Sequence, residues 1–209
     1  MTTAKPQLTE HGETRILALT EAATDLFLEK GMDGVSVDEL IQKVGGSRRN
    51  IYNRFGDKQG LFVEVITKLC DCQAAPLREM EIAGGDLVSA LQSFGERLLQ
   101  IVLQPRTLAL HRLMIAEGQR FPELSRAISA SGHEAGVAVL VRWLLTREED
   151  FRPNLSVTSL AELFVTLLVS KAQRDALTGM SEPLDSEEIA AIARQAVSVF
   201  LHGALMKDA

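Results

Sequence analysis

The sequence predicts an all-α protein in which a small N-terminal helical domain is followed by a larger helical bundle. Apolar residues recur at intervals of three and four along most of the chain, the spacing of one buried face of an α-helix. We find no strand signal, internal repeat or low-complexity segment. With 209 residues, of which 46% are hydrophobic, the chain can bury a sizeable core in one or two domains.

Residues 1–12 are polar, contain Pro6 and Gly12 and show no periodicity, so we expect a flexible arm. Helical periodicity begins at about Glu13 and ends at Lys30, before Gly31, a residue type typical of helix C-caps. The apolar face of this first predicted helix consists of Ile16, Leu19, Ala23, Leu26 and Phe27. We expect that face to pack behind the next two helices.

Residues 36–55 carry two short amphipathic helices joined by a glycine turn. Ser36 and Glu39 have the spacing of a capping box, in which the hydroxyl and the carboxylate each accept a hydrogen bond from an unpaired backbone N–H group. The first helix should end at Gly45, and its apolar face consists of Val37, Leu40, Ile41 and Val44.

The second short helix is predicted to begin after Ser47, whose hydroxyl is a preferred N-cap group. Ile51 and Phe55 lie four residues apart and should point inward. The more exposed side then carries Arg49, Tyr52 and Asn53. This arrangement predicts a helix-turn-helix whose second helix is the recognition helix.

Positive charge is concentrated in the same region. Between positions 43 and 58, five basic residues stand against one acidic residue, Asp57, so the local balance is +4 while the whole chain carries −6. The basic residues are Lys43, Arg48, Arg49, Arg54 and Lys58. A helical hairpin with a solvated basic edge would explain the charge alone. Charge combined with a capped helix, a Gly-Gly-Ser turn and a Tyr-x-x-Phe spacing favours contact with DNA phosphates.

Residues 44–55, VGGSRRNIYNRF, followed by Asp57-Lys58 and Leu61-Phe62, resemble the DNA-binding domain of TetR-family repressors. The resemblance covers residues 13–66 and implies a three-helix domain of the helix-turn-helix type. Two positions depart from the family pattern: Arg49 stands where a small residue is usual, and Gly60 stands where an acidic residue is usual. We therefore expect an unusual base-reading surface and a less firm start of the following helix.

Arginine pairs bidentately with guanine and asparagine with adenine. We therefore expect Arg49 and Asn53 to face base edges, with Arg48 and Asn50 nearby. The residues expected to hold phosphates are Ser36, Ser47, Tyr52 and Lys58. Because one short helix reads few base pairs, we expect a homodimer on a pseudo-palindromic double-stranded DNA operator.

Asp57 is expected to cap a fourth helix that runs to about residue 80 and connects the two domains. Gly84 and Gly85 then precede a helical effector-binding and dimerisation domain over residues 84–209. We expect its helices from Leu87 to Pro105, at about 106–119, from Pro122 onward, at 136–145, and at about 156–178 and 185–206. The helix at 136–145 should be buried almost all round. Residues 110–117, LHRLMIAE, and 120–124, RFPEL, resemble the effector domains of the AefR-like branch of the family.

We expect a small apolar or amphipathic effector to enter this second domain. Its candidate lining residues are Met114, Phe121, Trp143 and Phe164, although such side chains also form ordinary cores. Glu117 interrupts an apolar stripe, so it either forms an internal ion pair or recognises a polar group of the effector. We interpret His111 and His133 as structural histidines rather than ligand-binding residues.

Two apolar stripes on the last two helices predict a four-helix dimer interface. Its candidate residues are Leu160, Phe164, Leu167, Ile189, Ile192, Ala196 and Phe200, with Leu163 and Val199 in the same stripes. The alternative is that both stripes only close the core of a single subunit.

Other functional classes find little support. The longest apolar run, Val137–Val141, is far below the roughly 18 residues of a membrane span, and the N-terminus lacks the apolar segment of a secretory signal, so we expect a cytoplasmic protein. We expect Cys70 and Cys72 to be free thiols; a soft-metal or oxidant-sensing pair is less favoured because the two residues project differently from a helix. We find no catalytic, metal-binding or cofactor motif and predict no enzyme.

The combined prediction is a one-component DNA-binding regulator, a ligand-released repressor of the TetR type. The alternative is a helical small-molecule-binding protein or enzyme whose helix-turn-helix no longer binds DNA. Salt-dependent association with DNA would separate the two.

Overall fold

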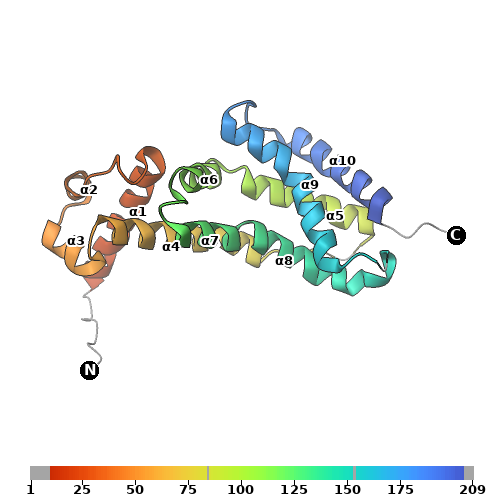
Figure 1. Ribbon diagram of the computed structural model, residues 1–209, viewed down its shortest axis with the longest axis horizontal. Coiled ribbons are helices and arrows are strands. Elements are labelled where there is room, and N and C mark those ends of the chain that lie inside the picture. Colours follow the sequence, from red (N-terminus) through yellow and green to blue (C-terminus); the bar gives the residue numbers. More distant parts are fainter. Residues whose placement is uncertain (1–9, 84, 153, 205–209) are drawn as a thin grey trace, which may run out of the picture. The chain divides into compact units, whose positions relative to one another are not determined.

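The computed structural model describes residues 10–83, 85–152 and 154–204, whose regular structure is helical (Figure 1). The elements are α1 (Glu10–Lys30), α2 (Val37–Val44), α3 (Arg48–Phe55), α4 (Lys58–Arg78), α5 (Leu87–Val102), α6 (Pro105–Glu117), α7 (Pro122–Ser131), α8 (His133–Leu144), the 3-10 helix η1 (Leu145–Asp150), α9 (Val157–Thr178) and α10 (Ser186–Ala204). The all-α prediction is confirmed. None of the described helices is long and apolar enough to cross a lipid bilayer.

The chain forms two compact units. The first contains the described part of Met1–Leu69 together with Leu113–Ser125, and the second contains Cys70–Arg112 and the described part of Arg126–Ala209. Three helices, α4, α6 and α7, contribute residues to both units, so the chain passes from one unit to the other inside helices. The predicted effector domain over 84–209 thus differs from the observed grouping, because residues 113–125 belong to the first unit.

The first unit is built on three phenylalanines. Phe62 of α4 is fully buried and packs edge-on against Phe27 of α1, with ring centroids 4.9 Å apart. Phe121, which immediately precedes α7, also packs against Phe62, with a centroid distance of 5.1 Å. Three more apolar residues of α4, Leu61, Val65 and Ile66, are at most 1% exposed.

The two short helices begin at the predicted caps. The Ser36 hydroxyl accepts a hydrogen bond from the Glu39 backbone N–H at 3.1 Å, and the Ser47 hydroxyl accepts one from the Asn50 backbone N–H at 3.3 Å. Between the helices, Gly45 and Gly46 have φ angles of +73° and +119°. Residues with a Cβ atom rarely adopt these angles, so the turn requires glycine.

Helix α4 begins with the predicted Asp57 cap. The Gly60 backbone N–H donates to the Asp57 carboxylate at 2.7 Å. A Cβ atom at Gly60 would lie 2.1 Å from the Phe55 carbonyl oxygen. Glycine therefore allows the end of α3 to approach α4 closely, and the expectation of a less firm helix start stays a prediction.

Several other boundaries differ from the predictions. Helix α1 begins at Glu10, so residues 10–12 of the expected arm are helical, and the rest of the arm lies outside the described residues. Helix α4 ends at Arg78. Helix α8 ends at Leu144 and is not buried all round, because Ala138 and Arg142 are exposed.

The second unit has its own aromatic core, formed where α5, α8, α9 and α10 pack together (Figure 1). Phe164 of α9 is fully buried, with its ring centroid 5.0 Å from that of Phe200 and 6.2 Å from that of Phe94. Gly95 of α5 lets its neighbours approach closely, since a Cβ atom there would lie 3.4 Å from the side chains of Ala193 and Leu168.

Candidate functional site

Helix α3 presents a polar face to solvent. Ile51 and Phe55 are 4% and 9% exposed and anchor the helix in the first unit. The exposed residues of the same helix are Arg48, Arg49, Asn50, Tyr52, Asn53 and Arg54. The side of α3 predicted to read DNA is therefore the accessible side, although its contacts with bases and phosphates stay a prediction.

Three ion pairs join successive helices around α3. They are Lys30–Glu39 between α1 and α2, Asp38–Arg48 between α2 and α3, and Arg54–Glu64 between α3 and α4. The Arg48 and Arg54 guanidinium groups each make two hydrogen bonds to their carboxylate. Bidentate pairs restrict orientation as well as position, so these contacts hold α3 in a defined direction.

The same pairs lower two carboxyl pKa values. The hydrogen bond from Arg48 lowers the pKa of Asp38, and the hydrogen bond from Lys30 lowers that of Glu39. A backbone hydrogen bond from Ser36 adds to the effect on Glu39, as expected for a capping box. Both carboxylates are therefore charged at neutral pH and keep their partners.

The five basic residues between positions 43 and 58 differ in whether a group of the protein already binds their charge. Arg48 and Arg54 are engaged with carboxylates, and the Lys58 ammonium donates to the Val35 carbonyl oxygen at 3.0 Å. Within the part of the chain that the structure describes, Lys43 and Arg49 form no ion pair. Arg49 is consequently the arginine of α3 whose guanidinium is available to a ligand.

Three of the five predicted effector residues belong to the first unit. Glu117 accepts a hydrogen bond from the Met32 backbone N–H, and Phe121 is buried against Phe62. Met114 is half-buried in the same segment, Leu113–Ser125. Glu117 thus has a backbone partner in the turn between α1 and α2, a role that neither of our two interpretations anticipated.

The other two predicted effector residues lie in the second unit but do not line its cavity. Trp143 is half-buried, with the Arg147 guanidinium 5.1 Å above its ring. Phe164 is a central core residue. Both side chains contribute to packing in the second unit, and a contact of either with an effector stays a prediction.

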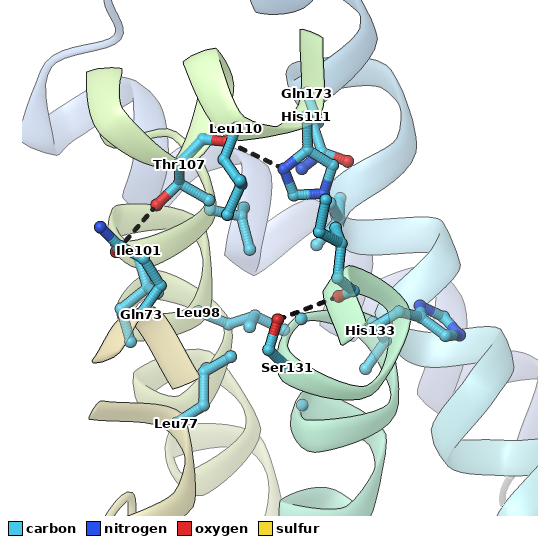
Figure 2. Close-up of a pocket in the computed structure, with 16 residues that line it drawn as sticks. Gln73, Leu77, Leu98, Ile101, Thr107, Leu110, His111, Ser131, His133 and Gln173 are labelled. Carbon is cyan, nitrogen blue, oxygen red and sulfur yellow. Dashed lines mark hydrogen bonds between the residues drawn. The ribbon is translucent and has the colours of Figure 1, made fainter. Parts of the chain in front are cut away.

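A cavity in the second unit lies among α4, α5, α6, α7, α8 and α9 (Figure 2). It encloses about 610 Å³, including its open mouth. The apolar lining consists of Leu77, Leu98, Ile101, Val102, Leu110, Ile128, Val165 and Val169, together with Gly132 and Gly136. A hollow bounded mainly by aliphatic side chains with a few polar groups has the lining typical of small-molecule sites.

Six polar residues complete the lining: Gln73, Thr107, His111, Ser131, His133 and Gln173. The Thr107 hydroxyl donates to Gln73 Oε1 at 3.3 Å, and His111 Nδ1 donates to the Thr107 carbonyl at 2.9 Å (Figure 2). The Ser131 hydroxyl donates to the Ile128 carbonyl at 3.2 Å. We had interpreted His111 and His133 as structural, and the structure places both at the cavity.

The predicted dimer stripes are mostly internal. Five of the seven candidates, Leu160, Phe164, Ile189, Ala196 and Phe200, are at most 8% exposed in the core of one subunit, and Ile192 packs against that core. Leu167 is 45% exposed, and two other residues of the stripes are exposed too, Leu163 at 59% and Val199 at 55%. Most of the stripe residues therefore close the core of a single subunit, and the dimer interface stays a prediction.

The two cysteines have different environments. Burial raises the pKa of the Cys70 thiol to about 11, whereas Cys72 is exposed. Because the thiolate is the reactive and metal-binding form, burial of Cys70 disfavours its reaction at neutral pH. The different environments of Cys70 and Cys72 do not favour a paired metal or oxidant sensor.

Comparison with known proteins matches both parts of the chain. Residues 19–65 match the tetR family of bacterial regulatory proteins, and residues 89–203 match the C-terminal domain of AefR-like transcriptional repressors. The chain therefore belongs to the TetR family of transcriptional regulators, within which its second unit resembles the AefR-like branch.

Individual relatives agree with this family. The HTH-type transcriptional repressor BdcR of Escherichia coli (strain K12) is 36% identical over 83 residues, a match that spans 38% of this chain and 42% of BdcR, less than half of that relative. A TetR-family regulator from Mesorhizobium loti MAFF303099 aligns over 95% of this chain and 100% of its own, with 25% identity and a TM-score of 0.74. A TetR regulator from Agrobacterium tumefaciens covers 93% of this chain and 96% of its own, with 26% identity and a TM-score of 0.74.

Proposed function

We propose that this protein is a one-component repressor that binds a pseudo-palindromic DNA operator as a homodimer in the cytoplasm. The observation that carries the proposal is the exposed face of α3, where Arg49 and Asn53 stand on a helix oriented by caps and ion pairs. Arginine and asparagine are the side chains best suited to guanine and adenine edges in the major groove. Asn50 lies near these two residues on the same helix, and Tyr52 contacts the phosphate backbone of the same DNA.

The dimer in this proposal forms through the outer side of α9 and α10. Leu163 and Leu167 lie four residues apart on α9, and Val199 lies on α10, which packs against α9. Their exposure in a single subunit leaves apolar surface that a second copy would cover. Two recognition helices related by a two-fold axis would then read two half-sites.

Release of DNA in this proposal follows from ligand entry into the cavity of the second unit. The cavity is lined by residues of α4, α6 and α7, the helices that also contribute to the first unit. A ligand changes DNA affinity only if it binds the released form more tightly than the DNA-bound form. By reciprocity, the operator must weaken ligand binding by the same factor.

Selection of bound duplexes from a random DNA library tests the proposal. We expect enrichment of an inverted repeat whose half-site centres lie roughly 34–36 Å apart, or a multiple of that spacing. The rival, a helical ligand-binding protein or enzyme that has lost DNA binding, would enrich no sequence. Enrichment of a single unrepeated site would contradict the dimeric mode of binding.

A further inference from the structure

The chemistry of the cavity lining restricts the ligand. Among the described residues that line it there is no Asp, Glu, Lys or Arg, although charged residues make up 24% of the whole chain. A carboxylate or ammonium group buried at such a site would lose its hydration without gaining a counter-ion. The lining therefore disfavours charged ligands.

The hydrogen bonds already formed at the cavity determine what its polar groups still offer. A backbone carbonyl only accepts, so the proton between His111 Nδ1 and the Thr107 carbonyl belongs to the imidazole. In the neutral ring, His111 Nε2 is then a hydrogen-bond acceptor. Gln73 uses its side-chain oxygen for the Thr107 hydroxyl, which leaves its amide N–H groups as donors.

Figure 2 shows how these groups are placed relative to the apolar lining. Thr107 and His111 lie in the upper part of the view, Gln73 lies at its left side at about mid-height, and Leu77 lies below Gln73. The side chains of His111 and Gln73 thus stand beside aliphatic walls.

We propose that the cavity binds an uncharged, largely apolar molecule that carries a hydroxyl group and a carbonyl group. The hydroxyl donates to His111 Nε2, and the carbonyl accepts from the Gln73 amide. The inference rests on the proposed function only in treating the cavity as the effector site. The ligand class itself follows from the residues that line the cavity.

Titration calorimetry of the protein alone, without DNA, tests the ligand class. We choose three probes with one aromatic body: 1-(6-hydroxynaphthalen-2-yl)ethanone, its 6-methoxy analogue, and 6-hydroxy-2-naphthoate. The methoxy probe lacks the hydroxyl donor, and the naphthoate replaces the neutral carbonyl by an anion. We expect the methoxy probe to bind about tenfold more weakly than the hydroxy ketone, since one neutral hydrogen bond contributes about that factor. The naphthoate should also bind at least about tenfold more weakly, because its carboxylate loses hydration without gaining a counter-ion.

Substitutions of His111 and Gln73 test whether these two residues cause the expected ligand preference. His111→Phe should reduce the affinity for the hydroxy ketone to that for the methoxy probe, and Gln73→Leu should weaken both ketones alike. His202→Phe is the matched control: His202 Nδ1 makes the same type of bond, to the Ser198 carbonyl at 2.5 Å, but the residue is exposed on α10 and does not line the cavity. Its affinities should equal those of the wild type.

Three results would overturn the proposal. They are naphthoate binding as tight as that of the hydroxy ketone, an unchanged hydroxyl preference in His111→Phe, and no binding of any probe at millimolar concentration. Fluorescence anisotropy with the selected operator is measured separately. A protein that binds the neutral probe but no DNA would uphold the ligand class and contradict the proposed repressor function.

Discussion

Glu117 and Met32 are 85 residues apart in the sequence, yet the Glu117 carboxylate accepts a hydrogen bond from the Met32 backbone N–H at 3.2 Å. Arg120 holds the same turn between α1 and α2 through Asp33, at 2.9 and 3.0 Å from its two oxygens. That turn leads directly into the helix-turn-helix. The segment Leu113–Ser125 therefore stabilises the position of α2, and we expect a displacement of α6 to reach the DNA-binding unit through this bond.

Removing the Glu117 carboxylate should destabilise the first unit. Glu117→Ala leaves the Met32 N–H without its acceptor, so we expect the free energy of unfolding to fall by about 1–2 kcal/mol. Glu117→Gln retains an acceptor oxygen and should lose less than half as much. Urea denaturation measures both, with Glu21→Ala on the exposed side of α1 as the control. Equal stability of Glu117→Ala and the control would contradict this role.

Arg49 and Arg48 should differ in their contribution to base recognition. Arg49→Ala should remove about 1–3 kcal/mol of discrimination at one position of each half-site, because its guanidinium is available to a base. Arg48→Ala should leave the sequence preference unchanged, because Arg48 is paired with Asp38. Repeating the library selection with each variant measures the preference. An identical operator for Arg49→Ala and the wild type would show that Arg49 does not read bases.

The dimer should depend on the outer side of α9. Leu167→Arg places a charge on the proposed interface, so we expect a monomeric mass in sedimentation at micromolar concentration, where the wild type should be a dimer. Val88→Arg is the control, because Val88 of α5 has a similar exposure, 44% against 45% for Leu167. If Leu167→Arg remains dimeric, the interface lies elsewhere on the subunit.

The ion pairs around α3 should contribute to stability only above acidic pH. The pKa values of Asp38 and Glu39 are lowered from their ordinary values of 3.8 and 4.5, so the contribution is fully present above those values and is lost as the pH falls through the lowered ones. The difference in urea midpoint between the wild type and the double variant Asp38→Asn/Glu39→Gln should therefore be small at pH 7 and disappear toward pH 2. A difference that stays constant with pH would exclude this linkage.

Local features could be predicted from the sequence because their causes are local. Ser36 and Ser47 cap the helices as predicted, since a cap depends on residues two or three positions away. The inward direction of Ile51 and Phe55 likewise follows from the helical period alone. The helix-turn-helix could therefore be predicted from the sequence.

Features that depend on distant packing were not predictable. The period identifies Leu160 and Phe200 as buried but cannot say whether the same subunit or a partner buries them. The partner of Glu117 is a backbone group 85 residues away. The cavity lies where the side chains of six helices leave space between them, and the helical period of the sequence does not predict such a space. One sequence feature does point to the cavity. Thr107 and His111 lie four residues apart on α6, the spacing of a polar stripe on one face of a helix.

The central claim, specific binding of operator DNA, is tested most directly by fluorescence anisotropy of the selected duplex at salt concentrations from 50 to 200 mM. Neutralisation of several phosphates by each dimer predicts that affinity falls by roughly 10³-fold or more over this range. A scrambled duplex of the same composition should bind at least about 10³-fold more weakly at physiological salt. Affinity that does not change with salt, or that is equal for the two duplexes, would contradict the account.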